Sequence, residues 1–359
     1  MTVNSEILSA SIRHSIWLER YRAQVAKKAL AELNKANRKL VERIAGELTR
    51  IEERGYSLSA ATQARLTQLL RLIADDRAEV FSAANDYTAD ELKDFAVYEA
   101  EFQAKMIKQA AMPVAALDMA MPTKSQLYAA VTKQPFRGRL LKNWYAGLAA
   151  NDAQRVTDAL RIGIADGQTT DQIVRQIRGT RALGYSDGVL DITRREAYSM
   201  VRTATAHVAA RAKEDLIAAN DDIVLGEQWI ATLDSRTTAT CASLDGKIFD
   251  IGKGPQVPRH FNCRSQRIPY LGETDIEGTR ASKFGPVPES TTYEQWLRGQ
   301  SASVQDDILG EAKGKLFREG GLKLDRFVDG SGREYTLKQL RKRDSDIFEA
   351  IFGDDARNI

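Results

Sequence analysis

The chain has 359 residues, 43% of them hydrophobic and 28% charged, so it can bury the cores of two or three domains. Its 52 basic and 49 acidic residues leave a formal net charge of +3, which is too small a bias to indicate nucleic-acid binding by itself. Two cysteines in a chain of this length argue against a fold built on disulfides and fit a reducing compartment.

Residues 1–112 are predicted to form a long helical arm or bundle. Glycine is rare and proline absent in this segment, and apolar residues recur on one helix face at steps of seven, four and three. We expect a first helix ended by Gly55, a second after it, and a third beginning at Thr88, because Thr88 and Glu91 have capping-box spacing. The apolar stripe is completed either within a self-contained bundle or by another chain.

The segment 111–124 is rich in Ala, Met and Pro and is expected to be a linker. After it, Thr169 and Gln172 have capping-box spacing ahead of a short helix that Gly179 ends. Further helices are expected at residues 126–133, 138–149, 152–165 and 194–219. The central part of the chain is therefore predicted to be mainly helical.

The most specific stretch of the sequence, residues 228–269, holds both cysteines and many turn signals. Short strands are expected at residues 228–231 and 247–251, the second following a turn at Asp245 and Gly246, since Asp-Gly suits the positive φ values of a hairpin turn. The Gly- and Pro-rich residues 252–258 cannot continue a strand and predict a loop that leads back to the hairpin.

That loop should bring His260 and Cys263 close to Cys241. One interpretation is a structural zinc site, which needs a fourth ligand. The candidates for that ligand are His207, Asp234 and Asp245. The other interpretations are a disulfide between the two cysteines, and buried free thiols with His260 hydrogen-bonded locally. A Cys-His nucleophile pair would need an oxyanion site and a third orienting residue, for which no pattern is present, so we do not expect an enzyme.

Positive charge also gathers in this stretch. Lys247, Arg259, Arg264 and Arg267 could bind phosphates of double-stranded DNA without sequence preference. The alternative is a solvated surface of mixed charge, in which nearby aspartates offset part of the positive charge.

The order of these residues resembles the phage Mu F-like minor head (head morphogenesis) family over roughly residues 140–270. The resemblance is carried by Trp229, Asp234-Ser-Arg236-Thr, Cys241, Leu244-Asp-Gly-Lys-Ile-Phe249, the Pro-containing loop and His260-Phe-Asn-Cys263-Arg264, ending in Pro269. Structural roles are expected for Trp229, Asp234 and Arg202, the last as an ion pair or a carbonyl clamp. The family usually has an acidic residue after the Arg-Thr pair that begins at Arg202, where this chain has Ala204, which weakens an enzymatic interpretation.

The C-terminal part also looks like the extension that such head proteins carry. Residues 271–292 are expected to be an extended connector, followed by helices with Trp296 and Leu297 as apolar anchors. A docking extension and a small terminal subdomain would have the same sequence pattern.

The sequence therefore predicts a mainly helical α+β protein with three parts: a helical arm at 1–112, a Mu F-like domain at 125–270 closed by the hairpin and loop, and an extension at 271–359.

The resemblance implies a minor capsid protein of a tailed phage or prophage that is made in the host cytoplasm and lies inside the capsid near the portal. Implied partners are the portal protein and the major capsid or scaffold protein, with a role in head assembly and in DNA packaging or ejection. We expect no membrane partner, since no apolar run has membrane-spanning length and no signal peptide is recognisable. The alternative is a DNA-binding protein or a metal-dependent, nuclease-like enzyme built on Cys241, His260 and Cys263.

Overall fold

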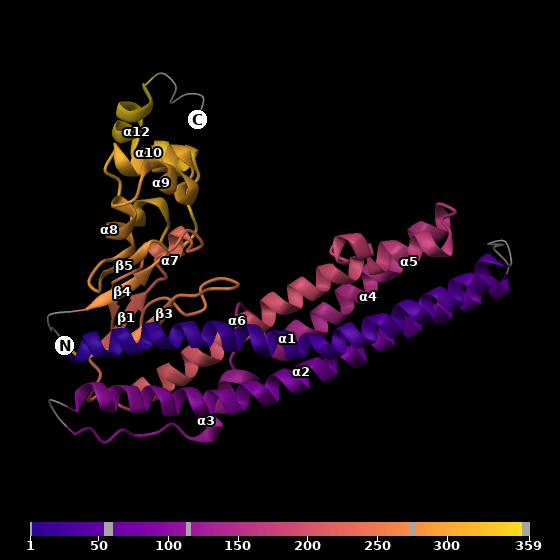
Figure 1. The fold of residues 1–359 in the computed structure, drawn as a ribbon, viewed down its shortest axis with the longest axis horizontal. Coiled ribbons are helices and arrows are strands. Elements are labelled where there is room, and N and C mark those ends of the chain that lie inside the picture. The colour runs from indigo at the N-terminus through magenta and orange to yellow at the C-terminus, as the bar shows by residue number, and fades with distance from the viewer. Residues whose placement is uncertain (1, 54–59, 113–115, 273–277, 354–359) are drawn as a thin grey trace. The chain divides into compact units, whose positions relative to one another are not determined.

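The computed structural model describes residues 2–53, 60–112, 116–272 and 278–353 (Figure 1). The chain separates into two compact units that are each assembled from distant stretches. Unit 1 comprises Met1–Leu18, Glu99–Pro122 and Lys213–Ile359, and unit 2 comprises Glu19–Tyr98 and Thr123–Ala212. The segments 1–112 and 125–270, predicted to be separate domains, thus each contribute to both units.

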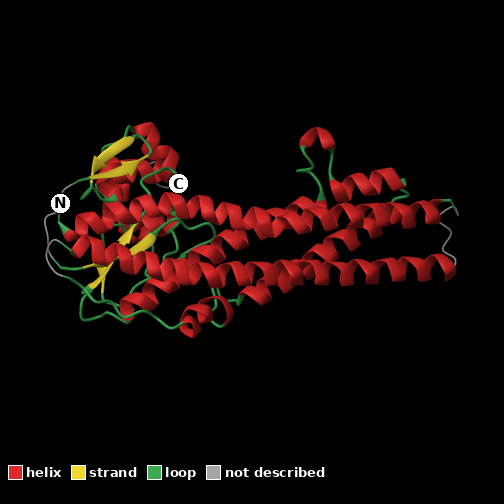
Figure 2. Cartoon of the chain, turned by 60° about the horizontal axis from the view of Figure 1, so that its bottom comes forward, coloured by secondary structure: helices red, strands yellow, loops and turns green. Residues whose placement is uncertain are grey.

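Unit 2 is built from helices, and the strands that the structure describes all belong to unit 1 (Figure 2). The helices of the first two thirds of the chain are α1 (Val3–Glu52), α2 (Ala60–Ala111), α3 (Lys124–Thr132), α4 (Leu141–Ala165), α5 (Thr170–Arg178), the 3-10 helix η1 (Arg181–Leu183) and α6 (Val189–Ala218). The predicted break between residues 149 and 152 is absent, because α4 is continuous there. The predicted helix end at Gly55 lies outside the described residues.

The apolar stripe of α1 is buried within unit 2. Leu40, Ile44 and Leu48 are at most 2% exposed and form one core with apolar residues of α2, α4, α5 and α6. Arg77 of α2 donates to Asn37 of α1 at 2.5 Å, which links these two helices. The stripe is therefore completed inside the chain, as expected of a self-contained bundle.

The helix start predicted at Thr88 is wrong, because α2 runs through this position without interruption. Thr88 is fully buried, and its hydroxyl donates to the Ala84 carbonyl and shares a hydrogen bond of 2.6 Å with the Tyr145 hydroxyl. The side chain is thus used in packing between α2 and α4 instead of capping a helix.

Unit 1 contains a three-stranded antiparallel sheet in the order β2-β1-β3. The strands are β1 (Gly226–Ile230), β2 (Ile248–Phe249) and β3 (Gln266–Tyr270). Gln228 of β1 lies opposite Ile248 on one side and Ile268 on the other. The pairing of the two predicted strands is confirmed, whereas β3 was not predicted and supplies the longer pairing with β1.

The residues after β3 do not form the predicted extended connector. Strands β4 (Thr279–Ser282) and β5 (Gly285–Pro288) form an antiparallel hairpin. Beyond it lie α8 (Tyr293–Arg298), α9 (Ala302–Leu309), α10 (Glu311–Arg318), the 3-10 helix η2 (Leu324–Phe327), α11 (Leu337–Arg343) and α12 (Ser345–Phe352). Trp296 and Leu297 are 2% and 0% exposed in a core that also contains Leu233 and Phe317. The predicted anchors are therefore core residues of a folded terminal part.

The structure confirms the predicted fold class, a mainly helical α+β protein with small antiparallel sheets. Among the described residues, none of the helices combines the length and apolar content that a membrane span needs.

Candidate metal centre

The cysteine and histidine side chains are positioned by two short elements of unit 1. Cys241 lies on the helix α7 (Ala239–Ala242), whose first turn is capped by Thr238 through a hydrogen bond from the Cys241 amide to the threonine hydroxyl. His260 and Cys263 lie on the loop before β3, where the Cys263 amide donates to the His260 carbonyl at 3.2 Å. Asn262, inside this turn, has a φ of 57°, which an asparagine tolerates better than most residues. The tight turn places His260 and Cys263 side by side.

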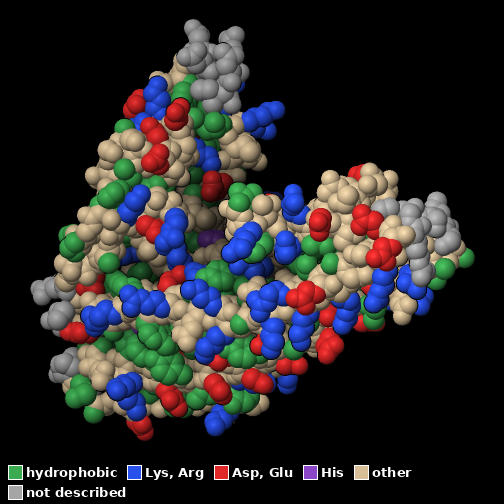
Figure 3. All heavy atoms as spheres, turned by 45° about the vertical axis from the view of Figure 1, so that its right-hand side comes forward, with side chains coloured by type: hydrophobic (Ala, Val, Ile, Leu, Met, Phe, Trp, Pro, Cys, Tyr) green, Lys and Arg blue, Asp and Glu red, His purple; other side chains and the backbone are tan. Residues whose placement is uncertain are grey.

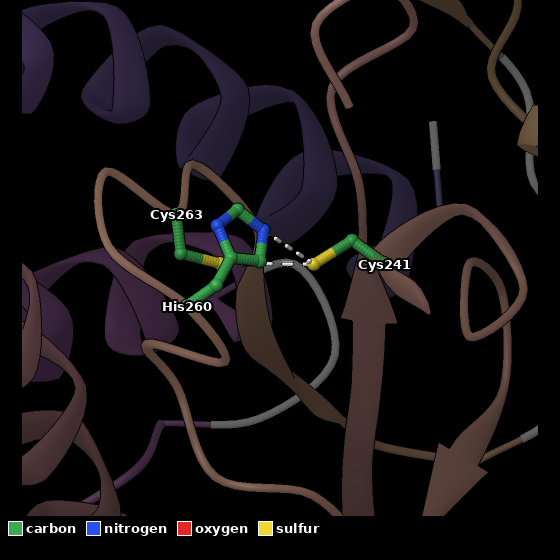
Figure 4. Close-up of side chains that lie close together, drawn as sticks. All are labelled: Cys241, His260 and Cys263. Carbon is green, nitrogen blue, oxygen red and sulfur yellow. Dashed lines mark hydrogen bonds between the residues drawn. The ribbon is translucent and has the colours of Figure 1, made fainter. Parts of the chain in front are cut away.

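The three side chains converge on one point (Figure 4). Cys241 Sγ lies 3.4 Å from His260 Nε2 and 3.7 Å from Cys263 Sγ. Both cysteines are buried and free of a disulfide, while the imidazole is partly exposed. The loop therefore brings His260 and Cys263 to Cys241, as the turn signals indicated.

The hydrogen bonds of His260 define its tautomer. Its Nδ1 lies 2.9 Å from the carbonyl oxygen of Phe261, which can only accept, so Nδ1 carries the proton. In the neutral ring Nε2 is then unprotonated and faces the sulfur of Cys241 and the hydroxyl of Thr238. A carbonyl on the far nitrogen of a histidine is the usual arrangement around a metal-binding imidazole.

The two thiols are unequal. The pKa of Cys263 is lowered, chiefly because Cys241 donates a hydrogen bond to its sulfur and secondly because His260 lies beside it, while burial opposes the shift. The pKa of Cys241 is raised by its role as donor in the same pair and by burial. Cys263 is thus the more readily deprotonated of the two thiols.

Two of the three candidates for a fourth metal ligand, Asp234 and Asp245, are engaged in other interactions. Asp234 accepts two hydrogen bonds from Arg264, at 2.5 and 2.7 Å. Asp245 is buried and accepts from Arg280 and from the amides of Ala231 and Tyr293. His207 belongs to unit 2. Among the described residues, the group of potential ligands contains Cys241, His260 and Cys263 alone.

The predicted DNA-binding side chains differ strongly in exposure. Arg267 is 5% exposed and forms ion pairs with Glu227 and Glu214, and Arg264 is paired with Asp234. Arg259 donates to the Ser331 carbonyl and is half-buried, and Lys247 is exposed. On the face seen in Figure 3, basic and acidic side chains both occur along the long helices. The four cations thus do not form one exposed cluster, and DNA binding by this group stays a prediction.

The residues with predicted structural roles are placed as follows. Trp229 is fully buried in β1. Asp234 holds Arg264, and its carbonyl accepts from the Tyr293 hydroxyl at 2.7 Å. Arg202, in unit 2, donates to Glu19 at 2.6 Å and forms an ion pair with it.

Sequence reasoning missed the buried ion pair between Asp245 and Arg280, whose side chains are 0% and 4% exposed. Arg280 donates to both carboxylate oxygens of Asp245 at 2.9 Å and also to the Thr291 carbonyl. The sequence analysis gives Asp245 as a turn residue and a candidate zinc ligand, and places Arg280 in a connector. The single signal available was a charged residue within an otherwise loop-like stretch, which is not specific.

The fold and the site together define a mainly helical α+β protein whose small antiparallel sheet is flanked by a cluster of two cysteines and one histidine. Residues 154–268 match the family described as Phage Mu protein F like protein. The resemblance drawn from the sequence is thereby confirmed over this segment, which contains β1, α7 and the whole Cys/His cluster. The family is one of phage head morphogenesis proteins.

The chain is also similar to a curated protein named NAD(+)–arginine ADP-ribosyltransferase EFV, from Enterococcus faecalis (strain ATCC 700802 / V583). The two chains are 27% identical over 158 residues, which are 40% of this chain and 31% of the relative. The chain thus spans about a third of the length of that relative. No solved structure matches this chain.

Proposed function

We propose that this chain is a minor capsid protein of a tailed phage or prophage and acts in head morphogenesis. The observation that carries the proposal is the match of residues 154–268 to the Phage Mu F-like family. The match includes the sheet strand β1 and the Cys/His loop, which is the part of the chain with the most specific sequence pattern.

We further propose that the protein binds the portal and lies in the capsid interior near it, with the major capsid or scaffold protein as a second partner. The family resemblance supports this location. The apolar stripe of α1 is buried against other helices of unit 2, so a portal subunit would meet the charged outer faces of α1 and α2 instead. Such a contact would weaken as salt concentration rises, because exposed charges are screened. A role in DNA packaging or ejection belongs to the same proposal.

The proposed role is structural and not enzymatic. The E. faecalis relative shares less than a third of its length with this chain, so the activity in its name need not reside in the shared part. A direct assay is incubation of the protein with labelled NAD⁺ and an arginine-rich acceptor, in which we expect no transfer of label. Labelled acceptor would overturn this part of the proposal, as would cleavage of linear DNA in the presence of Mg²⁺ or Zn²⁺.

Quantitative mass spectrometry of density-purified particles from the source phage or induced prophage tests the main proposal. We expect this protein at a few copies per portal ring, in chemical cross-links with the portal. Cross-links should map to exposed lysines of α1 and α2. Absence of the protein from purified particles would contradict the capsid location.

A further inference from the structure

Two of the three separations between the ligand atoms are close to the edges of a zinc tetrahedron. For Zn–S bonds of about 2.3 Å and a Zn–N bond of about 2.0–2.1 Å at tetrahedral angles, the S···S edge is about 3.8 Å and the S···N edge is about 3.6 Å. The corresponding separations here are 3.7 Å between the sulfurs of Cys241 and Cys263, and 3.4 Å between Cys241 Sγ and His260 Nε2. All three atoms lie within 4.8 Å of one another. An S–S bond of about 2.05 Å would require the sulfurs to move much closer together.

The surroundings also suit a metal. The Phe261 carbonyl accepts from Nδ1 of His260, so that the unprotonated Nε2 faces the sulfur of Cys241. Both cysteines are buried, Cys241 on α7 and Cys263 in the turn that begins at His260. Ligands that are pre-oriented in this way lose little conformational freedom when the ion binds.

We propose that Cys241, His260 and Cys263 bind one Zn²⁺ ion through two thiolates and one imidazole nitrogen, with an exchangeable water as the fourth ligand. Both sulfurs bind the ion as thiolates, so any proton that they still carry is released to solvent. The fourth position is assigned to solvent because Asp234 and Asp245 are held by arginines and because the His260 ring is partly exposed. The ion would fasten α7 to the loop that leads into β3. This inference does not depend on the proposed role in the phage head.

Zinc content of the full-length protein is the direct test. The protein is purified in reductant, equilibrated with Zn²⁺ and passed into metal-free buffer, and bound metal is measured by mass spectrometry. We expect about one zinc per chain for the wild type, and at least a tenfold loss for Cys241→Ser, Cys263→Ser and His260→Ala. Gln256→Ala is the matched control, because Gln256 is an exposed residue of the same loop with no role in the site, and this variant should retain the metal.

Two measurements on the wild type keep the test decisive if a variant fails to fold. Thiols are titrated in denaturant with chelator: two reactive thiols are expected, whereas none would indicate a disulfide and overturn the proposal.

The Co²⁺-substituted protein should show thiolate-to-cobalt charge transfer and tetrahedral d–d bands. Added imidazole or azide should shift those bands by replacing the water, and unchanged bands would contradict the open fourth position. A folded, reduced wild type that retains no zinc would overturn the proposal outright.

Discussion

At the scale of single residues, the structure shows charges placed where water cannot reach them. Asp245 and Arg280 are both almost completely buried, and the carboxylate also accepts the amide hydrogens of Ala231 and Tyr293. One carboxylate therefore joins β1, the β4–β5 hairpin and the start of α8. Removing one partner of such a pair costs more than the pair contributes, because the other charge stays buried without compensation.

We predict that Asp245→Asn lowers the free energy of unfolding by about 3–5 kcal/mol, since Arg280 keeps its charge and loses its counter-ion. Urea denaturation of the two proteins measures the difference. Glu334→Gln is a matched control in the same unit, because Glu334 is exposed and its ion pair with Lys313 should contribute less than about 1 kcal/mol. Equal changes in the free energy of unfolding for the two substitutions would show that the buried ion pair contributes no more to stability than the exposed one.

A second residue-scale prediction concerns pH. His207 is buried in unit 2 beside Phe136, and burial lowers its pKa from 6.5 to about 4. Between these two values the unfolded chain binds a proton at His207 that the folded chain does not bind, so stability falls as the pH decreases. A shift of this size corresponds to a loss of about 3 kcal/mol between pH 7 and pH 4.

His207→Gln should remove this part of the acid sensitivity, because glutamine does not titrate and its amide can still donate a hydrogen bond. Thermal melts of wild type and variant should run parallel between pH 7 and 8 and diverge below pH 6.5, with the wild type losing more stability. Parallel profiles down to pH 4 would mean that His207 is protonated in the folded protein without cost.

At the scale of elements, local signals succeeded where the neighbours in sequence are also the neighbours in space. The capping box of α5 needs only Thr169 and Gln172, three residues apart, and it is present as predicted. Thr88 and Glu91 have the same spacing, but Thr88 forms its hydrogen bond with Tyr145, 57 positions away, which no local pattern shows. The role of Thr88 is therefore set by its tertiary contacts and not by the local sequence.

Strand β3 was missed for a related reason. It contains Arg267 and Pro269, a charge and a residue without an amide hydrogen, which obscure the pattern of a buried strand. In the fold, Arg267 is paired with Glu227 of β1, so its charge is met by the adjacent strand. The Cys/His cluster could be foreseen because Gly, Pro and Asn mark its loop, whereas the partners of Asp234 and Asp245 depend on distant parts of the chain.

We predict that Thr169→Ala lowers the stability of unit 2 by about 1 kcal/mol, because the Gln172 amide loses its acceptor at the start of α5. Hydrogen exchange of the α5 amides should become faster. Thr67→Ala is the control: Thr67 is an exposed threonine inside α2, where alanine has the higher helix propensity, and the change should be neutral or slightly stabilising. A similar loss in both variants would argue against capping as the cause.

At the scale of the whole molecule, unit 1 is assembled from both ends of the chain. Ile7 and Leu8, at the start of α1, belong to the same buried core as Ile230 of β1 and Ile268 of β3. Asn4 accepts from the Leu271 amide at 3.0 Å and donates to the Gly272 carbonyl, which ties the first helical turn to the end of β3. The start of α1 is therefore part of the sheet's packing and not of a separable arm.

Because the start of α1 packs against the sheet, a substitution there should affect the strands. A separate domain ending at residue 112 would not lead to this prediction. Ile7→Ala should cost about 2–5 kcal/mol, because a fully buried side chain is truncated in a core that it shares with the sheet. Amides of β1 and β3, more than 200 positions away in sequence, should then exchange faster with solvent. Ile16→Ala makes the same chemical change on the same helix at a side chain that is 50% exposed, and it should leave strand exchange unchanged. If Ile7→Ala accelerated exchange in α1 alone, the sheet would be stable without the start of α1. The contacts between the start of α1 and the sheet would then contribute little to the stability of unit 1.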